Sequence, residues 1–206
     1  ARQRAAQRAE GVPDHRTRFD RLELLAMLLR ENEAALCESL QADFGQRSLS
    51  NAAMTEIAYP ISAIRYAQKH LRAWMKDEPR KVALLPRLLG ARARVRHQPL
   101  GVIGVISPWN FPVNLAVAPL TDILAAGNRA MVKPSEHTPR NSALLAELVA
   151  RYFSDEEVAV FPGGLEAGEA FARLPFDHLV FTGAGSIARH VARAASENLV
   201  PLTLEL

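Results

Sequence analysis

The feature that most constrains this chain is an alternation, from Pro99 onward, of short apolar runs with segments of helical periodicity. The apolar runs predict strands at 101–106, 129–133, 158–161, 178–181 and 202–205. The segments between them predict helices at 113–126, from 139 onward, at 166–173 and at 186–198. Strands that alternate with helices form parallel sheets, so the sequence predicts an α/β fold: a Rossmann-like parallel sheet with helices on both faces.

Residues before Pro99 predict a different organisation. Apolar residues recur at helical spacing from 15 to about 44 and again from 50 to 74, with Pro60 as a candidate bend. Prolines and a glycine then precede an alternating segment at 92–98, which predicts a connector and an exposed strand. We therefore expect N-terminal helices at 1–78, a connector and strand at 79–98, and βαβ units at 99–206. Thr138 is expected to cap the helix that begins at Pro139.

The composition is that of one globular domain, because 49% of the 206 residues are hydrophobic and 23% are charged. No apolar run approaches the roughly 18 residues of a membrane span. The first residues, which are rich in arginine and glutamine, lack the apolar core of a signal peptide. We expect a soluble, cytoplasmic protein without a membrane partner.

The sequence gives little support to nucleic-acid or metal binding. Basic residues concentrate between Pro79 and Gln98, and the net charge is +3, but no aromatic residue alternates with them as a single-strand-binding surface requires. A solvated connector or edge strand is favoured. The six histidines lack ligand spacing, so no metal site is expected. The single cysteine, Cys37, lies on an apolar helical stripe, which predicts a buried structural thiol.

Ligands of parallel α/β sheets bind at the carboxyl ends of the strands, so the loops after each strand are the candidate binding segments. Lys133 and Glu136 directly follow the second strand of the predicted sheet. The carboxylate could accept hydrogen bonds from ribose hydroxyls, and the ammonium could reach a hydroxyl or a phosphate. A surface ion pair explains the same spacing equally well.

A glycine turn follows the strand at 178–181 and opens the next helix. Its form, Gly183-x-Gly185-x-x-Ala188, is similar to a dinucleotide-binding turn, in which helix amides face an anion. By that pattern Glu205 lies near the distance expected of a ribose-binding acid. A helix entry made of small residues is the alternative.

Asn110 lies between Trp109 and Phe111, in a turn flanked by prolines at the end of the first predicted strand. An amide held rigidly there could donate to a developing oxyanion. Asparagine is also a common helix cap, and a helix is expected to follow directly. From these residues alone the cap is favoured.

The motifs taken together resemble the aldehyde dehydrogenase superfamily in order and spacing, across the whole chain. They are Pro108-Trp-Asn-Phe-Pro112, Gly127-Asn with Lys133-Pro-Ser-Glu136, Phe181-Thr-Gly183 and Leu204-Glu-Leu206. Other segments, such as Leu174-Pro-Phe-Asp-His-Leu179, are similar to the coniferyl-aldehyde dehydrogenase branch.

The resemblance implies oxidation of an aldehyde, aromatic and similar to coniferyl aldehyde, to a carboxylic acid through a cysteine thioester, with hydride transfer to NAD. It assigns Asn110 to the oxyanion and Glu205 to the general base, replacing the cap and ribose interpretations. It assigns Lys133 and Glu136 to the adenosine ribose, and Glu136 favours NAD while leaving NADP possible. The residues that it implies line the cofactor are Pro108, Trp109, Phe181, Thr182, Gly183, Ala184 and Ile187.

The chain departs from the family pattern in the glycine turn and at its end. Ala184 stands where Ser or Asn is common and Ala188 where glycine is usual, so weaker cofactor binding is expected. In the family, Leu204-Glu-Leu206 continues into Gly-Gly-Lys, the nucleophilic cysteine and the catalytic domain. We therefore expect 206 residues that form an incomplete NAD(P)-binding domain, inactive alone, from an enzyme that forms homodimers or larger homo-oligomers. A truncated nucleotide-binding or dimerisation module is the alternative.

Overall fold

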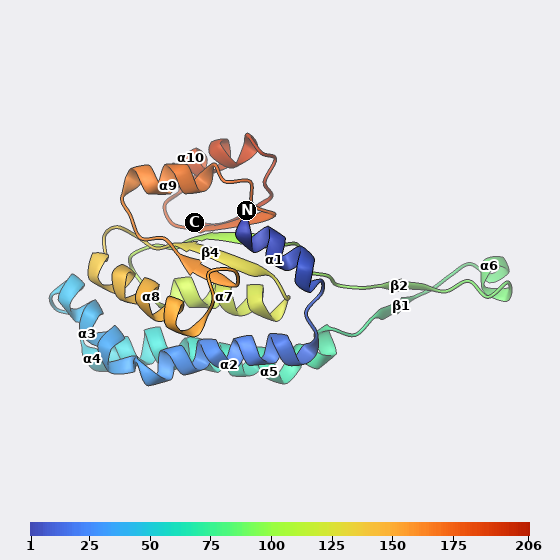
Figure 1. Ribbon diagram of the computed structural model, residues 1–206, viewed down its shortest axis with the longest axis horizontal. Helices are drawn as coiled ribbons and strands as arrows, with labels where there is room; N and C mark the ends of the chain where they lie inside the picture. The colour runs from blue at the N-terminus through green and yellow to red at the C-terminus, as the bar shows by residue number, and fades with distance from the viewer.

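A five-stranded parallel sheet forms the centre of the computed structural model, which describes residues 1–206 (Figure 1). Its strands, in the spatial order β5-β4-β3-β6-β7, are β3 Val102–Ile106, β4 Arg129–Lys133, β5 Val158–Val160, β6 His178–Thr182 and β7 Leu202–Glu205. The predicted parallel sheet is confirmed, and each predicted strand end lies within one residue of its observed position. From β3 the chain adds β4 and β5 on one side of the sheet, and it then returns to add β6 and β7 on the other side of β3. The boundary between β3 and β6 is therefore the switch point of the sheet, where ligands of such sheets bind.

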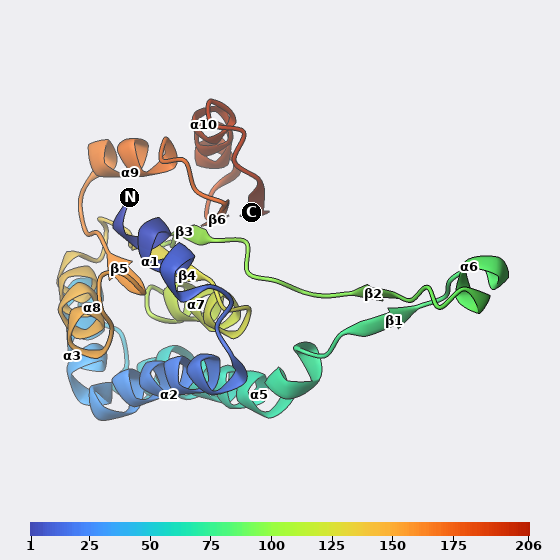
Figure 2. The same cartoon turned by 45° about the vertical axis from the view of Figure 1, so that its right-hand side comes forward.

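Helices cover both faces of the sheet (Figure 2). On one face lie α7 Asn114–Ala125 and α8 Pro139–Tyr152, and on the other lie α9 Leu165–Ala172 and α10 Gly185–Ser196. Each face has its own apolar core, of 29 buried residues on the α7–α8 side and 10 on the α9–α10 side. The larger core includes the N-terminal helices, so these helices belong to the same folded unit.

The N-terminal helices form a further layer outside α7 and α8. They are α2 His15–Glu31, α3 Glu33–Phe44, the short α4 Leu49–Ala52 and α5 Tyr59–Trp74. The single helix predicted from 15 to 44 is wrong in one respect, because Asn32 interrupts it and donates from its side chain to the Leu28 carbonyl at 2.8 Å. A π-helical turn, Ala53–Ala58, precedes α5, since Pro60 has no amide to continue a regular ladder.

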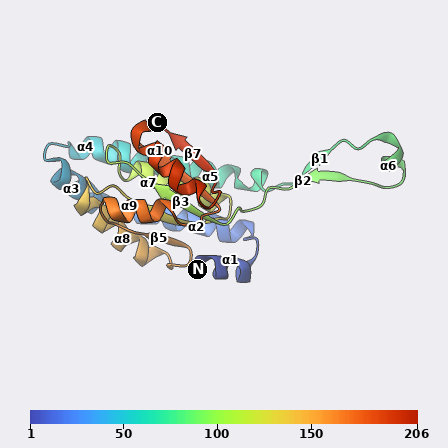
Figure 3. The same ribbon diagram turned by 90° about the horizontal axis from the view of Figure 1, so that it is seen from above.

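Three elements, α1, β1 and α6, were not predicted individually from the sequence. Helix α1 Arg2–Glu10 lies beside the sheet. Strand β1 Glu78–Arg80 pairs antiparallel with β2 Ala93–Val95, and the short α6 Leu84–Leu88 joins them. Together they form an arm that projects away from the sheet (Figure 3). The exposed strand at 92–98 is thus present as β2, but part of the predicted connector is its partner strand.

The charges on the arm are partly neutralised within it. Arg94 and Arg96 both pair with Asp77, at 2.9 and 2.7 Å, and His97 lies 3.2 Å from a Glu78 oxygen. The basic cluster seen in the sequence is therefore interrupted by carboxylates in space. None of the helices is long and apolar enough to cross a lipid bilayer.

Candidate functional site

A cleft of about 410 Å³ opens at the carboxyl ends of β3, β6 and β7. Its lining residues are Pro108, Trp109, Asn110, Thr182, Gly183, Ala184, Glu205 and Leu206. The register explains why these distant segments meet: Ile106 lies beside Phe181, and Thr182 lies beside Glu205, so the strands end together. The fold thus brings Asn110 and Glu205, both predicted from the sequence as catalytic, to one cleft.

Asn110 is held by bonds that leave its amide nitrogen free. Its Oδ1 accepts from the Phe111 amide at 3.1 Å, and its backbone carbonyl accepts from Arg47 Nη2 at 3.0 Å. The Nδ2 group donates to no atom of the chain. An amide anchored through its oxygen, with its N–H groups free, is suited to donate to an anionic oxygen.

The cap interpretation of Asn110 is wrong. Helix α7 begins at Asn114, after an N-cap residue, Val113, whose side chain has no oxygen. The amides of Val113 and Asn114 donate instead to Oε2 of Glu56, at 3.1 and 2.9 Å. Glu56 comes from the π-helical turn, far away in the sequence, and a carboxylate there also complements the helix dipole.

Glu205 is the last residue of β7 and is exposed to the cleft. Its backbone carbonyl accepts from the Gly183 amide at 3.0 Å, which ties the end of β7 to the glycine turn. Its carboxylate forms no ion pair and no side-chain hydrogen bond within the chain. It is therefore free to contact a molecule in the cleft.

Lys133 and Glu136 lie at the same edge of the sheet but outside the cleft. Lys133 pairs in register with Ile106 at the end of β4, and its Nζ lies 3.3 Å from Glu136 Oε2. Burial alone would raise the pKa of Glu136, but its backbone amide and Lys133 outweigh burial and lower that pKa below its ordinary value. The carboxylate is thus ionised and half exposed beside a buried ammonium.

The remaining predicted cofactor residues differ in exposure. Phe181 is buried in the apolar core on the α9–α10 side, whereas Ile187 is half exposed on the first turn of α10. Ala184 is the N-cap of α10 and has no side-chain acceptor, so the first amides of this helix lack a side-chain cap. An uncapped helix N-terminus attracts an anion such as a pyrophosphate.

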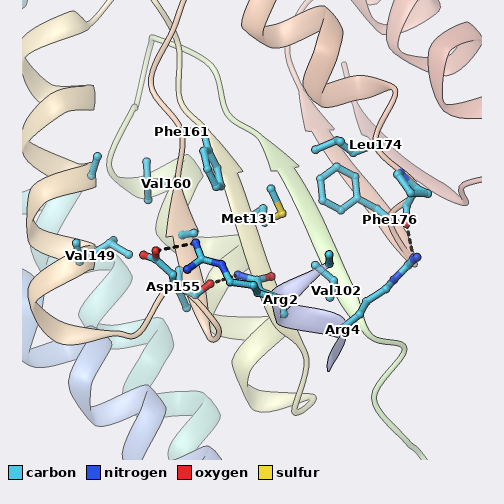
Figure 4. Close-up of a pocket in the computed structure, with 17 residues that line it drawn as sticks. Arg2, Arg4, Val102, Met131, Val149, Asp155, Val160, Phe161, Leu174 and Phe176 are labelled. Atoms are coloured by element: carbon cyan, nitrogen blue, oxygen red, sulfur yellow. Dashed lines mark hydrogen bonds and ion pairs between the residues drawn. The ribbon is translucent and has the colours of Figure 1, made fainter. Parts of the chain in front are cut away.

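A second cavity, of about 320 Å³, is lined by residues of α1, α8 and the sheet (Figure 4). Its lining is mostly apolar, with Val102, Met131 and Phe176 among the residues. The charged groups at its rim are already paired, Arg2 with Asp155 at 3.3 Å and Arg4 with Asp177 at 3.0 Å. It contains none of the predicted site residues.

Cys37 lies away from the cleft. Its side chain is in the apolar core with Leu36 and Leu40, and burial, assisted by Glu33, raises the pKa of its thiol. A buried thiol of raised pKa is a poor nucleophile. Arg47 and Glu56 contact the Asn110 loop, but neither belongs to a motif in the sequence, and neither was predicted as a site residue.

Comparisons with known proteins identify relatives of this chain. The aldehyde dehydrogenase family model matches residues 1–206. The chain is 53% identical over its full length to a Caulobacter vibrioides protein named "probable coniferyl aldehyde dehydrogenase", and it spans 42% of the length of that protein. A substrate-bound structure of Staphylococcus aureus AldH superposes with a TM-score of 0.94 at 32% identity, covering 100% of this chain and 44% of the other. A Mycobacterium tuberculosis aldehyde dehydrogenase in complex with NAD⁺ has a TM-score of 0.77 at 30% identity, covering 92% and 39%.

Proposed function

The chain belongs to the aldehyde dehydrogenase family, and from this premise we propose that it supplies the NAD site, the oxyanion donor and the general base of an enzyme that oxidises an aldehyde to a carboxylic acid. The main support for the proposal is that Asn110 and Glu205 line the same cleft, at the switch point of the sheet. Spatially, the two groups belong to one site although 95 positions separate them in the sequence.

Asn110 stabilises the negative charge that develops on the aldehyde oxygen during nucleophilic attack. Its Nδ2 donates to that oxygen while Phe111 and Arg47 hold the residue from behind. Loss of one such donor typically lowers kcat by about 10²- to 10³-fold.

Glu205 acts in the second half of the reaction, when a thioester is hydrolysed. Its carboxylate takes a proton from water as the water oxygen bonds to the acyl carbon, and the carbon–sulfur bond then breaks to release the acid and the thiolate. The nucleophilic thiol is not Cys37, which is buried away from the cleft. We propose that it comes from residues other than these 206, which by themselves have no dehydrogenase activity.

The residues at the sheet edge fit a nicotinamide dinucleotide, which accepts the hydride of the aldehyde when bound. Glu136 and Lys133 would hold the adenosine ribose, and the uncapped N-terminus of α10 would face the pyrophosphate. The ionised Glu136 would repel a 2′-phosphate, so NAD is the proposed cofactor over NADP.

We propose an aromatic aldehyde such as coniferyl aldehyde as the substrate, in line with the name of the Caulobacter relative.

The test of the two catalytic roles uses the full-length protein that contains this chain. Asn110→Ala should lower kcat by about 10²- to 10³-fold. Glu205→Gln should release about one NADH per site and then stall, because acylation proceeds and hydrolysis does not. Asn51→Ala and Glu197→Gln, both exposed and outside the cleft, are matched controls. Normal turnover by either site variant would refute its assigned role.

We also propose that the full-length protein forms a homodimer or larger homo-oligomer through the arm. Its tip carries four leucines that are 64–83% exposed, Leu84, Leu85, Leu88 and Leu89. An exposed apolar cluster of this kind marks a protein-interaction surface. Replacing Leu85 and Leu89 by Glu should lower the molar mass measured by light scattering. An unchanged mass would exclude the arm tip from the interface.

A further inference from the structure

We propose that Arg47 and Glu56 are positioning residues that hold Asn110 where it can donate to the oxyanion, an inference that rests on the proposed role of Asn110. Arg47 lies between α3 and α4, and Glu56 lies in the π-helical turn. Both come from the N-terminal helical layer, and neither lines the cleft. Any effect on the chemistry must therefore pass through the loop that carries Asn110.

Glu56 fixes the segment that follows Asn110. Its side chain is fully buried, and Oε2 accepts from the amides of both Val113 and Asn114. Its other oxygen, Oε1, lies 2.9 Å from Arg47 Nη1. Burial raises the pKa of Glu56, and the two amides and Arg47 oppose that effect. A buried carboxylate is costly unless its partners are all in place, so this group holds the segment and Arg47 in a defined arrangement.

Arg47 fixes Asn110 and the residues on either side of it. Its side chain is only 13% exposed, and Nη2 donates to the Asn110 carbonyl at 3.0 Å. The guanidinium lies over the rings of Phe44 and Phe111, 4.6 and 5.3 Å from their centroids. The Phe44 ring is in turn 6.2 Å from that of Trp109. A planar guanidinium can serve two acceptors and stack on a ring at once, which an ammonium cannot.

These contacts immobilise the loop while leaving the reactive group free. The backbone is bonded at the Asn110 carbonyl and at the first amides of α7, and the rings beside Asn110 are packed against Arg47 or Phe44. The Nδ2 group of Asn110, by contrast, donates to no atom of the chain. Because misplacing a catalytic group by about 1 Å can cost about 100-fold in rate, this support should be visible in kcat.

The test uses the full-length enzyme and two Arg47 variants. Arg47→Lys keeps a cation opposite Glu56 and should fold, but a single Nζ on a shorter side chain replaces the two guanidinium nitrogens that face Glu56 and the Asn110 carbonyl. We expect its kcat to fall about 10-fold, and that of Arg47→Gln by up to about 100-fold. The KM for the aldehyde and the Kd for NAD should change by less than about threefold. In an Asn110→Ala background, Arg47→Lys should lower kcat by less than about twofold, because the group that it positions is gone.

Arg21→Gln is the matched control. Arg21 is a buried arginine in two ion pairs, with Glu10 and Glu157, and lies outside the cleft. It should lower the unfolding temperature without lowering the kcat of the folded enzyme.

Three outcomes would overturn the inference. An Arg47→Lys enzyme with normal kcat, beside an Asn110→Ala enzyme that is strongly impaired, would refute the positioning role and leave the proposed function standing. Equal losses from Arg47→Lys with and without Asn110 would show that Arg47 acts elsewhere. Normal kcat in Asn110→Ala would refute the oxyanion role and, with it, this inference.

Discussion

A single carboxylate at the end of α1 joins three elements through two buried arginines, and its removal should be costly. Glu10 Oε1 lies 2.8 Å from Arg21 Nη2 in α2, and Glu10 Oε2 lies 2.7 Å from Arg129 Nη2 in β4. Both arginine side chains are 6% exposed, and that of Glu10 is 28% exposed. Arg21 has a second partner in Glu157, at 2.9 Å. Glu10→Gln would leave the shape but place an amide N–H against a guanidinium N–H.

The expected loss follows from burial and from the partners that remain. Breaking a fully buried ion pair costs about 3–5 kcal/mol. Glu10 is partly exposed and Arg21 keeps Glu157, so solvent and the second carboxylate recover part of that energy. We expect Glu10→Gln to lower the free energy of unfolding by about 2–3 kcal/mol.

The measurement is equilibrium urea unfolding at pH 7, followed by tryptophan fluorescence. Glu147→Gln is the control, because Glu147 and Arg151 form an i,i+4 pair with side chains 58% and 60% exposed. It should cost no more than about 0.5 kcal/mol. If Glu10→Gln cost less than about 1 kcal/mol, or no more than the control, the bridge would contribute no more than a surface pair, and the argument from burial would be wrong.

Three further results are expected. Gly104→Ala should lower the free energy of unfolding in urea by about 2 kcal/mol, because the new Cβ would lie 2.6 Å from a carbon of the Phe176 ring. The control, Gly168→Ala, lies inside α9, where the new Cβ would have no atom closer than 3.9 Å, so it should be neutral or stabilising. Hydrogen bonding to Arg65 lowers the pKa of Glu23 from 4.5 to about 2, so their pair stabilises the protein above pH 4.5 and is lost as the pH falls through 2. Glu23→Gln should therefore cost about 1 kcal/mol at pH 7, after allowance for solvent exposure, and nothing below pH 2. Cys37 should react with a thiol reagent far more slowly in the native protein than in urea, and equal rates would contradict its burial.

The strands could be predicted because their determinants are local. The run 129–133 is short, has an apolar centre and is bounded by a glycine-asparagine pair and a proline, and β4 has the same bounds. Helix α1 was missed because its residues form no apolar stripe. It is held instead by contacts from far along the chain: Gln3 Nε2 donates to the carbonyls of Ala130 and Asp155, each at 2.9 Å. Such bonds leave no periodic trace in the sequence.

The predicted helix caps were wrong for the same reason, because the groups that bind the helix amides come from distant parts of the chain. Thr138 was predicted to cap α8, but its hydroxyl oxygen is buried without a partner. The amides of Arg140 and Asn141 donate to Asp43 instead, at 3.2 and 2.9 Å. Asp43 of α3 accepts from the first amides of α8, and Glu56 of the π-helical turn accepts from those of α7, so both carboxylates come from the N-terminal layer. The sequence near the start of each helix contains the amides that donate but not the carboxylate that accepts from them.

For Glu205, the local pattern and the wider fold suggest two different roles. The glycine turn, α10 and β7 form the βαβ unit that the sequence predicts, and Glu205 ends β7 as a ribose-binding acid of such a unit would. Its neighbour across the cleft, however, is Asn110 from the loop after β3, which the unit does not contain. The two roles make opposite predictions for Glu205→Gln in the full-length enzyme. A ribose ligand would weaken NAD binding, whereas a general base would leave the Kd for NAD unchanged and stop turnover after one NADH per site. A weakened Kd with normal hydrolysis of the acyl-enzyme would return Glu205 to the ribose role.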